Sequence, residues 1–455
     1  MSRRTGAPLA LALAQTTALV AGCTGDVGTF TISIVTAPES SVMDDVSHAR
    51  LTLETDPPVV AESDLDADGR LALAIEIPVA GGLALLTFEG FDAGGELIAL
   101  GRSGPLPLGA QNAAIKIYVA APLSIAAAPV QLPGGRNDLG VTAVSYGVLL
   151  AGGRDGDGDP TDELLIYNVY DHGLDEGDPL PAPRARPSVG FGVLGLAYVY
   201  GGEDGDGDPT PDLWAFDTTV APAGAWAILD SDEAPPRAGA SLAPLGNEEF
   251  LVVGQPTVLI DGVRQVAEPF PGAPPLAGRA ASTEQSGIIF TLIAGEGAGT
   301  TGAVRLVGND FDEEPAPSDV LRTEHGLAAV SDGRMVIAGG AVEGVATRAV
   351  IDCDVPNSGY ESVPDVLSVG RRGAAVAATA GYLVVAGGVD EDGAVRADAD
   401  VIDLETMARI ATLALAGPRR GAVAAPLANG QILIAGGEDS DGTPVATIEL
   451  FTPPE

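Results

Sequence analysis

The chain has 455 residues and a formal net charge of −40, because 63 Asp and Glu residues face only 23 Lys and Arg residues. So large a negative charge repels nucleic acid and anionic lipid headgroups, and we exclude both as general partners. Hydrophobic residues make up 46% of the chain, which excludes a disordered protein, so the acidic side chains must cover a folded surface. A chain of this length is expected to form two or more domains.

Residues 1–22 have the composition of a targeting segment rather than of a folded element. Arg3 and Arg4 form a basic start, residues 7–21 are mostly apolar, and the run ends in Val-Ala-Gly-Cys at residues 20–23. This ending resembles the lipobox of bacterial lipoproteins, in which a signal peptidase cuts before the cysteine and the thiol carries diacylglycerol. The resemblance predicts a lipoprotein signal peptide, export and lipidation of Cys23; an ordinary secretory signal is the alternative.

The lipid on Cys23 is the only membrane attachment that we expect, since no other apolar run approaches the ~20 residues of a spanning helix. Thr24 follows the cysteine where inner-membrane lipoproteins of enteric bacteria carry aspartate. The resemblance therefore favours the outer membrane, without distinguishing its periplasmic face from the cell surface. Once Cys23 is acylated only Cys353 remains, which excludes an intrachain disulfide and predicts a buried, unreactive thiol.

Residues 23–122 are predicted to form a small β-domain. Period-two alternation between clusters of Gly, Pro and Asp predicts short antiparallel strands at residues 29–35, 49–54, 70–77, 83–91, 96–100 and 114–120. So many strands in so short a segment favour a β-sandwich of immunoglobulin-like or transthyretin-like type. We expect this domain to be a spacer next to the lipid anchor, with an adhesion unit as the alternative.

Residues 123–455 contain seven copies of a short apolar run that ends in glycine. Five copies carry a doublet, as in VLLAGG (148–153) and LVVAGG (383–388), and two are degenerate, at 250–255 and 291–297. The first glycines lie at positions 152, 201, 254, 295, 339, 387 and 436, so successive copies are 41 to 53 residues apart. A period of this size built from short strands predicts a β-propeller.

The repeats resemble the kelch repeat, whose four-stranded blades carry Gly-Gly at the end of the second strand. The resemblance covers residues 124–455 and implies an all-β protein with a seven-bladed propeller, or a six-bladed one if a degenerate repeat is an insertion. The last repeat ends at Glu455 without a fourth strand, and residues 124–132 match the place of such a strand. We therefore predict that residues 124–132 complete the last blade and close the ring.

Arginine recurs just before the first strand of each repeat. Because the first strand is innermost in a propeller, we expect seven guanidinium groups around one mouth of the central channel. The kelch resemblance implies that such a face reads anions, which planar guanidinium groups bind well. The alternative is that these arginines pair with the acidic loops after the glycine doublets and only join neighbouring blades. The arginines are Arg136, Arg186, Arg237, Arg279, Arg322, Arg371 and Arg419.

The acidic loops are candidates for calcium binding. DGDGDPT occurs at 155–161 and 204–210, and DLDADG at 64–69, with carboxylates at alternate positions that resemble the first half of an EF-hand loop. Pro160 and Pro209 stand where that loop needs glycine, so calcium is a secondary hypothesis beside solvated turns, and no other cofactor is expected. The candidate ligands are Asp155, Asp157, Asp159, Asp204, Asp206 and Asp208.

We do not expect an enzyme. The three histidines, His48, His172 and His325, have no metal-binding spacing, and no hydrolase or phosphate-binding motif occurs. We expect a monomeric, exported, lipid-anchored binding scaffold whose propeller face recognises a protein or an anionic glycan or peptide of the cell envelope. The alternatives are a purely structural or adhesive envelope lipoprotein and a propeller enzyme that acts on glycans.

Overall fold

A computed structural model describes residues 30–64, 82–108, 113–296, 302–331 and 333–454. Cys23, the predicted strand 70–77 and most of the loop 64–69 lie outside these ranges. Strands dominate the described residues, and the helical elements among them are two single 3-10 turns, η1 (Ser318–Val320) and η2 (Val355–Asn357). The predicted all-β class is confirmed. In the described part of the chain no helix is long and apolar enough to cross a membrane.

The N-terminal module contains a four-stranded antiparallel sheet in the order β3-β2-β5-β6, a parallel pair β1-β8 and a short pair β4-β7. Alternation of apolar residues places Leu51 and Leu53 of β2 in one core with Phe88 of β5 and Ile117 of β8. The sheet and the parallel pair therefore share one core. The strands are β1 (Phe30–Val35), β2 (His48–Leu53), β3 (Val59–Asp64), β4 (Leu83–Ala84), β5 (Leu86–Phe91), β6 (Leu97–Arg102), β7 (Leu106–Pro107) and β8 (Ala113–Tyr118).

The prediction of antiparallel strands throughout this module is wrong for β1 and β8, which run parallel in the register Ile32↔Ile115. Strands so far apart in the sequence need no tight hairpin between them, so alternation alone does not fix their direction. The predicted strand 83–91 divides at Leu85 into β4 and β5, and β3 was not predicted. Its sequence VVAESD alternates half-buried and exposed residues, which leaves only a weak hydrophobic signal.

Residues after β8 form seven sheets of the same pattern, each antiparallel and ordered along the chain. The first four are β10 (Gly140–Val144), β11 (Gly147–Ala151), β12 (Leu164–Asn168), β13 (Leu174–Glu176); β14 (Ser188–Phe191), β15 (Leu196–Tyr200), β16 (Leu213–Asp217), β17 (Ala225–Leu229); β18 (Leu242–Gly246), β19 (Glu249–Val252), β20 (Val258–Asp261), β21 (Val266–Pro269); and β22 (Arg279–Gln285), β23 (Ile288–Ala294), β24 (Ala303–Val307), β25 (Asp310–Glu313).

The last three sheets follow the same order, with the short strand β28 added to the fifth. They are β26 (Thr323–Ala329), β27 (Arg334–Val342), β28 (Val345–Ala346), β29 (Val350–Asp354), β30 (Gly359–Val363); β31 (Ala375–Thr379), β32 (Tyr382–Ala386), β33 (Asp398–Asp403), β34 (Ala408–Ala414); and β35 (Val423–Pro426), β36 (Ile432–Ala435), β37 (Ile448–Thr452), with β9 (Ser124–Ala127) as its fourth strand.

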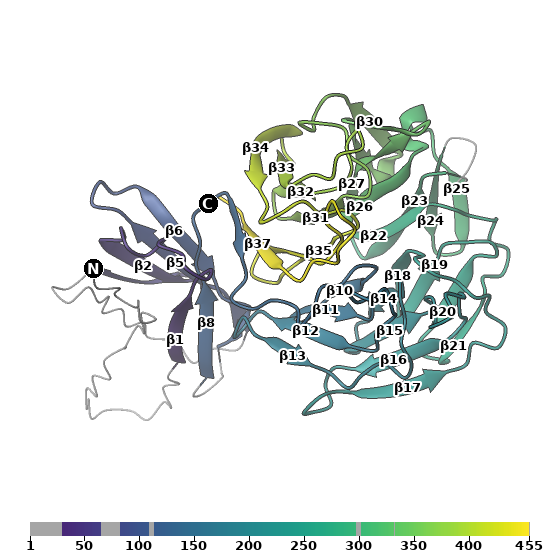
Figure 1. The fold of residues 1–455 in the computed structure, drawn as a ribbon, viewed down its shortest axis with the longest axis horizontal. Coiled ribbons are helices and arrows are strands. Elements are labelled where there is room, and N and C mark those ends of the chain that lie inside the picture. The colour runs from purple at the N-terminus through teal and green to yellow at the C-terminus, as the bar shows by residue number, and fades with distance from the viewer. Residues whose placement is uncertain (1–29, 65–81, 109–112, 297–301, 332, 455) are drawn as a thin grey trace.

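The sheets stand around a common centre, as a propeller requires. Their first strands contact one another in a closed cycle, which runs β10, β14, β18, β22, β26, β31, β35 and back to β10. Figure 1 shows these strands near the middle of the ring and the N-terminal module to one side. The second strands are mostly buried, and Val148–Ala151 entirely so, because a neighbouring sheet covers each face. Buried apolar strands between stacked sheets account for the runs that precede the glycines.

The two ends of the ring meet in one sheet. β9 pairs antiparallel with β37 in the register Ala127↔Glu449 and Ser124↔Thr452, so the segment that follows the N-terminal module lies beside the last strand of the chain. These residues fall within the predicted closing segment 124–132. The pairing covers the free edge that β37 would otherwise expose.

The N-terminal module docks on the first sheet through backbone hydrogen bonds. The amide of Lys116 in β8 donates to the carbonyl of Tyr170 (2.9 Å), and the amide of Tyr118 donates to Nε2 of His172 (3.1 Å). Nδ1 of His172 lies 2.9 Å from the hydroxyl of Tyr167. The side chain of His172 is buried, and burial lowers its pKa to about 4, so the imidazole is neutral at physiological pH.

Candidate functional site at the mouth of the central channel

The glycine doublets hold each sheet against the next one. In five sheets the amide of the second glycine donates to the carbonyl of an arginine that precedes the next sheet, over 2.7 to 2.9 Å. Both glycines have positive φ, and a Cβ on Gly387 would lie 2.3 Å from the carbonyl oxygen of Arg419. Only glycine fits such a contact. The pairs are Gly153–Arg184, Gly202–Arg237, Gly340–Arg371, Gly388–Arg419 and Gly437–Arg136.

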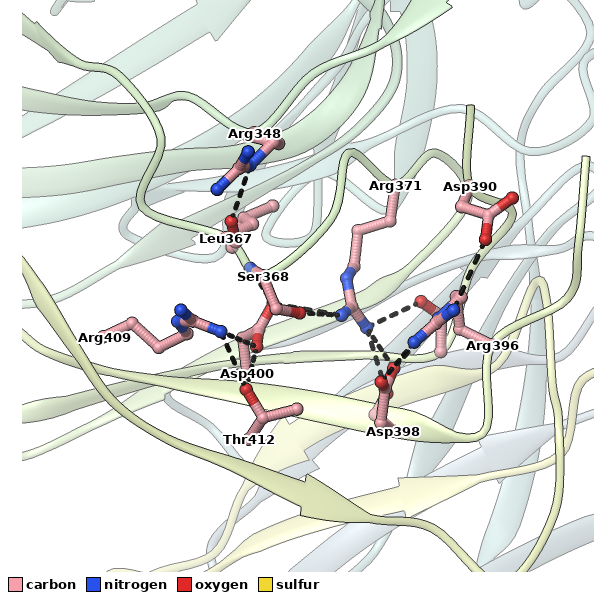
Figure 2. A network of polar contacts seen from close by, with 11 residues as sticks. Arg348, Leu367, Ser368, Arg371, Asp390, Arg396, Asp398, Asp400, Arg409 and Thr412 are labelled. Atoms are coloured by element: carbon pink, nitrogen blue, oxygen red, sulfur yellow. Dashed lines mark hydrogen bonds and ion pairs between the residues drawn. The ribbon is translucent and has the colours of Figure 1, made fainter. Parts of the chain in front are cut away.

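The side chain of Arg371 turns away from the channel into the sheet that follows it. Its guanidinium group is fully buried and lies 3.2 Å from the carboxylate of Asp398 and 3.0 Å from that of Asp400. It also donates to Oγ of Ser368 (3.1 Å), and Arg396 holds Asp398 from the other side, as Figure 2 shows. The arrangement is an internal ion-pair network in which Nη1 and Nη2 of Arg371 are hydrogen-bonded, while its buried Nε has no partner among the described residues.

Three other arginines repeat this arrangement with acceptors of their own sheets. Arg136 pairs with Glu163 over 2.5 Å, and Arg419 pairs with Glu449 over 2.5 Å. Arg322 donates to the carbonyls of Gly339 (3.0 Å) and Ala349 (3.1 Å) and to Asp319. All three arginine side chains are buried, and desolvation lowers the pKa values of Arg322 and Arg419. These residues and Arg371 stabilise their sheets.

The prediction of seven guanidinium groups around the channel mouth is therefore wrong for four residues, Arg136, Arg322, Arg371 and Arg419. The alternative prediction, pairing with the acidic loops after the doublets, is also wrong for these four. Their acceptors belong to other segments, such as third strands in the case of Asp398, Asp400 and Glu449. The sequence pattern located the arginines but could not show which way each side chain turns.

We call the arginine whose carbonyl accepts from the preceding glycine doublet the corner arginine. Before the second sheet the corner arginine is Arg184 rather than the predicted Arg186. Arg184 pairs with Asp212 and is buried, with its guanidinium carbon 4.8 Å from the ring centroid of Trp214. Arg237 occupies the corner of the third sheet, where it donates to the carbonyl of Pro256, and desolvation lowers its pKa. Equal spacing to the glycine doublet could have identified Arg184, since it and Arg237 both precede the next first glycine by 17 residues.

A cavity of about 740 Å³ runs between the first strands and forms the central channel. Its walls carry mostly small or aliphatic residues, including Gly140, Ser188, Gly326, Ala375 and Val423. Charged residues gather at one part of the channel, which we call the mouth. The charged lining residues are Asp138, Arg186, Glu203, Arg279 and Glu324.

Arg186 reaches across the third sheet at this mouth. Its Nη1 donates to Oε1 of Glu203 over 2.8 Å, and the other oxygen of Glu203 accepts from Arg154 over 2.5 Å. A Cβ on Gly239, which precedes the third sheet, would lie 2.9 Å from Nη2 of Arg186. The absence of a side chain at Gly239 therefore leaves the space that the Arg186 guanidinium group occupies.

Arg279 takes a position that no other sheet fills with a charge among the described residues. It pairs with Ala294 at the start of the inner strand, where the other sheets have pairs such as Gly140↔Ala151 and Ala375↔Ala386. β22 and β23 have seven residues each against five in β31 and β32, and these four extra residues move the arginine from the corner to the channel wall.

Arg279 also differs from the corner arginines in its environment. Within the described ranges no hydrogen bond or ion pair to its guanidinium group is found, and the side chain is accessible to solvent. Desolvation by the channel walls and repulsion from Arg186 lower its pKa. Two guanidinium groups that repel each other at the mouth of a cavity favour an anion between them.

The acidic loops have a structural explanation. Oδ1 of Asp155 accepts the amides of Asp157 (2.9 Å) and Asp159 (3.1 Å), and Asp204 does the same for Asp206 and Asp208. Asp439 accepts the amides of Asp441 and Thr443 in the same way, so the turn does not need a carboxylate at its fifth position. In the part of the chain that the structure covers, no three Asp, Glu, His or Cys side chains converge as metal ligands.

His48, His172 and Cys353 lie apart from the mouth, whereas His325 lines the channel next to Glu324. His48 pairs with Asp64 in the N-terminal module, and His172 is buried at the junction with the first sheet. His325 is buried beside the channel, where desolvation lowers its pKa to about 3. Cys353 is buried in β29, and burial raises the pKa of its thiol, in agreement with the predicted unreactive side chain.

Comparison with known proteins gives no family for this chain. No protein-family model matches it, and no curated protein matches it. Among the solved structures that resemble it is one described as "Structure of YjhT", with 15% sequence identity and a TM-score of 0.47. The similarity covers 70% of this chain and 96% of that one.

Proposed function

We propose that the seven sheets are the blades of a seven-bladed kelch-type propeller, which an immunoglobulin-like or transthyretin-like sandwich holds away from a lipid anchor at Cys23. The closed cycle of first strands and the recurring Gly-Gly at the ends of second strands support this architecture. The lipobox-like ending of the first segment supports export and an outer-membrane location. On this proposal the protein is a monomeric binding scaffold of the cell envelope rather than an enzyme.

The ligand site of this scaffold is the channel mouth, and its ligand carries an anionic group. The position of Arg279 carries this proposal. An arginine at the wall of a channel, without a carboxylate partner among the described residues and next to a second arginine, is unfavourable for the free protein. A carboxylate or sulfate on a glycan, peptide or protein would accept from both guanidinium groups and remove their repulsion.

The experiment is affinity capture from detergent-solubilised cell envelope with the full chain as bait. The variant Arg186→Ala/Arg279→Ala is compared with Arg264→Ala, which removes an exposed arginine paired with Asp261 and Glu268 away from the mouth. We expect a partner that wild type and Arg264→Ala retain and the double variant loses. Equal capture by all three would assign the protein to the structural or adhesive alternative.

The lipid anchor is tested separately. We expect wild type to sediment with membranes and to carry a diacylglycerol mass on its N-terminal peptide. Cys23→Ser should leave the membrane fraction without a change in the melting temperature of the folded domains. A Cys23→Ser variant that stays on the membrane would contradict the anchor and leave the channel-mouth proposal intact.

A further inference from the structure

In six of the seven sheets a residue at or just before the start of the inner strand has a left-handed backbone, and we call these residues the ring positions. Each of four ring amides donates to the ring carbonyl of the preceding sheet over 2.7 to 3.0 Å, as Arg186 does to Asp138. The backbone geometry is thus the same whichever residue is present. The ring positions are Asp138 (φ 55°), Arg186 (φ 52°), Gly239 (φ 66°), Glu324 (φ 53°), Gly373 (φ 61°) and Gly421 (φ 63°).

Glycine is the residue that this backbone favours, and three ring positions have it. Arg186 and Glu324 pay a conformational cost there, because only Gly, Asn and Asp adopt left-handed angles readily. Glu324 is 50% exposed and pairs with Arg372, which is 42% exposed, over 3.1 Å, whereas Arg186 is 47% exposed and pairs with Glu203, which is 17% exposed, over 2.8 Å. An ion pair exposed on both sides contributes little to stability, so stability does not explain the charge at Glu324.

The charged ring residues and Arg279 together present two cations and two anions to one cavity. All four line the channel, with Arg186 and Arg279 on either side of Gly239. Asp138 belongs to the sheet before Arg186, and Glu324 to the sheet after Arg279. The mouth therefore has two arginines, one of which pairs with Glu203, and an anionic ring residue on each side of them.

We propose that the channel mouth binds a zwitterionic ligand, a short peptide whose carboxylate lies between Arg186 and Arg279 and whose ammonium group is accepted by Glu324 or Asp138. This inference rests on the proposed anion-binding function and specifies the ligand class. A ligand without net charge is not repelled by a protein of net charge −40. The small wall residues, among them Gly140, Gly326 and Ala375, leave room for a slender chain along the channel.

The test uses triglycine as the probe, with N-acetyl-triglycine and triglycine amide as its singly charged analogues. Titration calorimetry on the full chain should show that either modification weakens binding by about tenfold or more, since each removes one charge-assisted contact. Arg279→Ala should lose binding of all three peptides. Glu324→Gly should bind triglycine and N-acetyl-triglycine equally, if Glu324 is the group that accepts the ammonium.

Melting temperatures separate this role from a structural one. Glu324→Gly and Arg186→Gly relieve the left-handed strain and should melt at or up to roughly 2 °C above wild type. Gly421→Ala is the matched control, because it adds the same strain at a ring position where a Cβ meets nothing within 4 Å, and it should melt lower. A clear fall in melting temperature for Glu324→Gly would show a structural role and overturn the inference.

The remaining outcomes distinguish the two proposals. If N-acetyl-triglycine binds as tightly as triglycine and its binding still requires Arg279, the result contradicts a zwitterionic ligand and supports anion binding at the mouth. If none of the three peptides binds, the peptide ligand is wrong, and the capture experiment alone decides whether the mouth recognises an anion.

Discussion

Two arginines of this protein, Arg371 and Arg279, show how register separates a stabilising role from a binding one. Arg371 lies at a sheet corner, where the buried carboxylate of Asp400, the partly buried one of Asp398 and a hydroxyl accept from it. Arg279 precedes its glycine by the same number of residues, but a hairpin four residues longer places it on the channel wall, where it forms no ion pair with a described residue. A buried charge has to be paired, whereas an accessible one is available to a ligand.

Arg371→Ala tests the corner role. It would leave Asp400 buried without its main counter-charge, so we expect the free energy of unfolding to fall by about 3–5 kcal/mol. Arg371→Lys should recover little of the lost free energy of unfolding, because one ammonium group cannot contact both carboxylates. The measurement is chemical denaturation followed by circular dichroism, with Arg264→Ala as a control expected to lose much less, because Arg264 is exposed and Asp261 keeps the amides of Val263 and residue 264. A stable Arg371→Ala protein would contradict the structural role.

At the scale of elements, the glycine doublet and the corner arginine act as one joint between sheets. The doublet ends the second strand, and its second amide reaches the arginine carbonyl of the next sheet. The sequence predicted the second and third strands because buried apolar runs of five residues between turns are distinctive. It did not predict the partners of the arginines, since these contacts join segments that lie up to about thirty residues apart, as in Arg419 and Glu449.

Gly387→Ala and Gly393→Ala form a matched pair for this joint. Both glycines have positive φ, 66° at Gly387 and 84° at Gly393, so both alanines are strained. Only at Gly387 would the Cβ also collide with a backbone oxygen, whereas at Gly393 nothing lies within 4 Å. We expect a loss of about 1 kcal/mol for Gly393→Ala and more than about 2 kcal/mol for Gly387→Ala.

Thermal or chemical unfolding measures the difference between these two variants. Equal losses would show that backbone strain alone, rather than the close approach of the next sheet, requires glycine at the end of the second strand.

At the scale of the whole molecule, one junction links the N-terminal module to the ring. β8 leads into β9, which closes the ring against β37, and His172 of the first sheet accepts the amide of Tyr118 at the end of β8. Tyr167, Asp171 and Lys116 are the other groups that act on the imidazole; Asp171 raises its pKa and Lys116 lowers it. A proton on Nε2 would face the N–H group of Tyr118, so the hydrogen bond between Tyr118 and His172 would be lost.

The junction should therefore weaken in acid. The folded pKa of His172 is about 4, below the unfolded value of 6.5, so its contribution is fully present above pH 6.5 and is lost as the pH falls toward 4. Over this pH range the free energy of unfolding of wild type should fall by about 3 kcal/mol relative to that of His172→Asn, a variant that does not titrate at this position. Free energies of unfolding of both proteins at several pH values give this difference; parallel pH profiles would contradict it.

The sequence by itself determined the repeat, the all-β class and the order of the strands within a repeat, because apolar period and glycine position are local properties of the chain. It also located the arginines. Only the tertiary structure decided that Arg371 is buried and that Arg279 faces the channel, because a four-residue difference in hairpin length changes register without changing the spacing to the next glycine. The mouth, with Asp138, Glu203 and Glu324, forms only where separate sheets come together around one axis. No local sequence pattern predicts which residues lie side by side there.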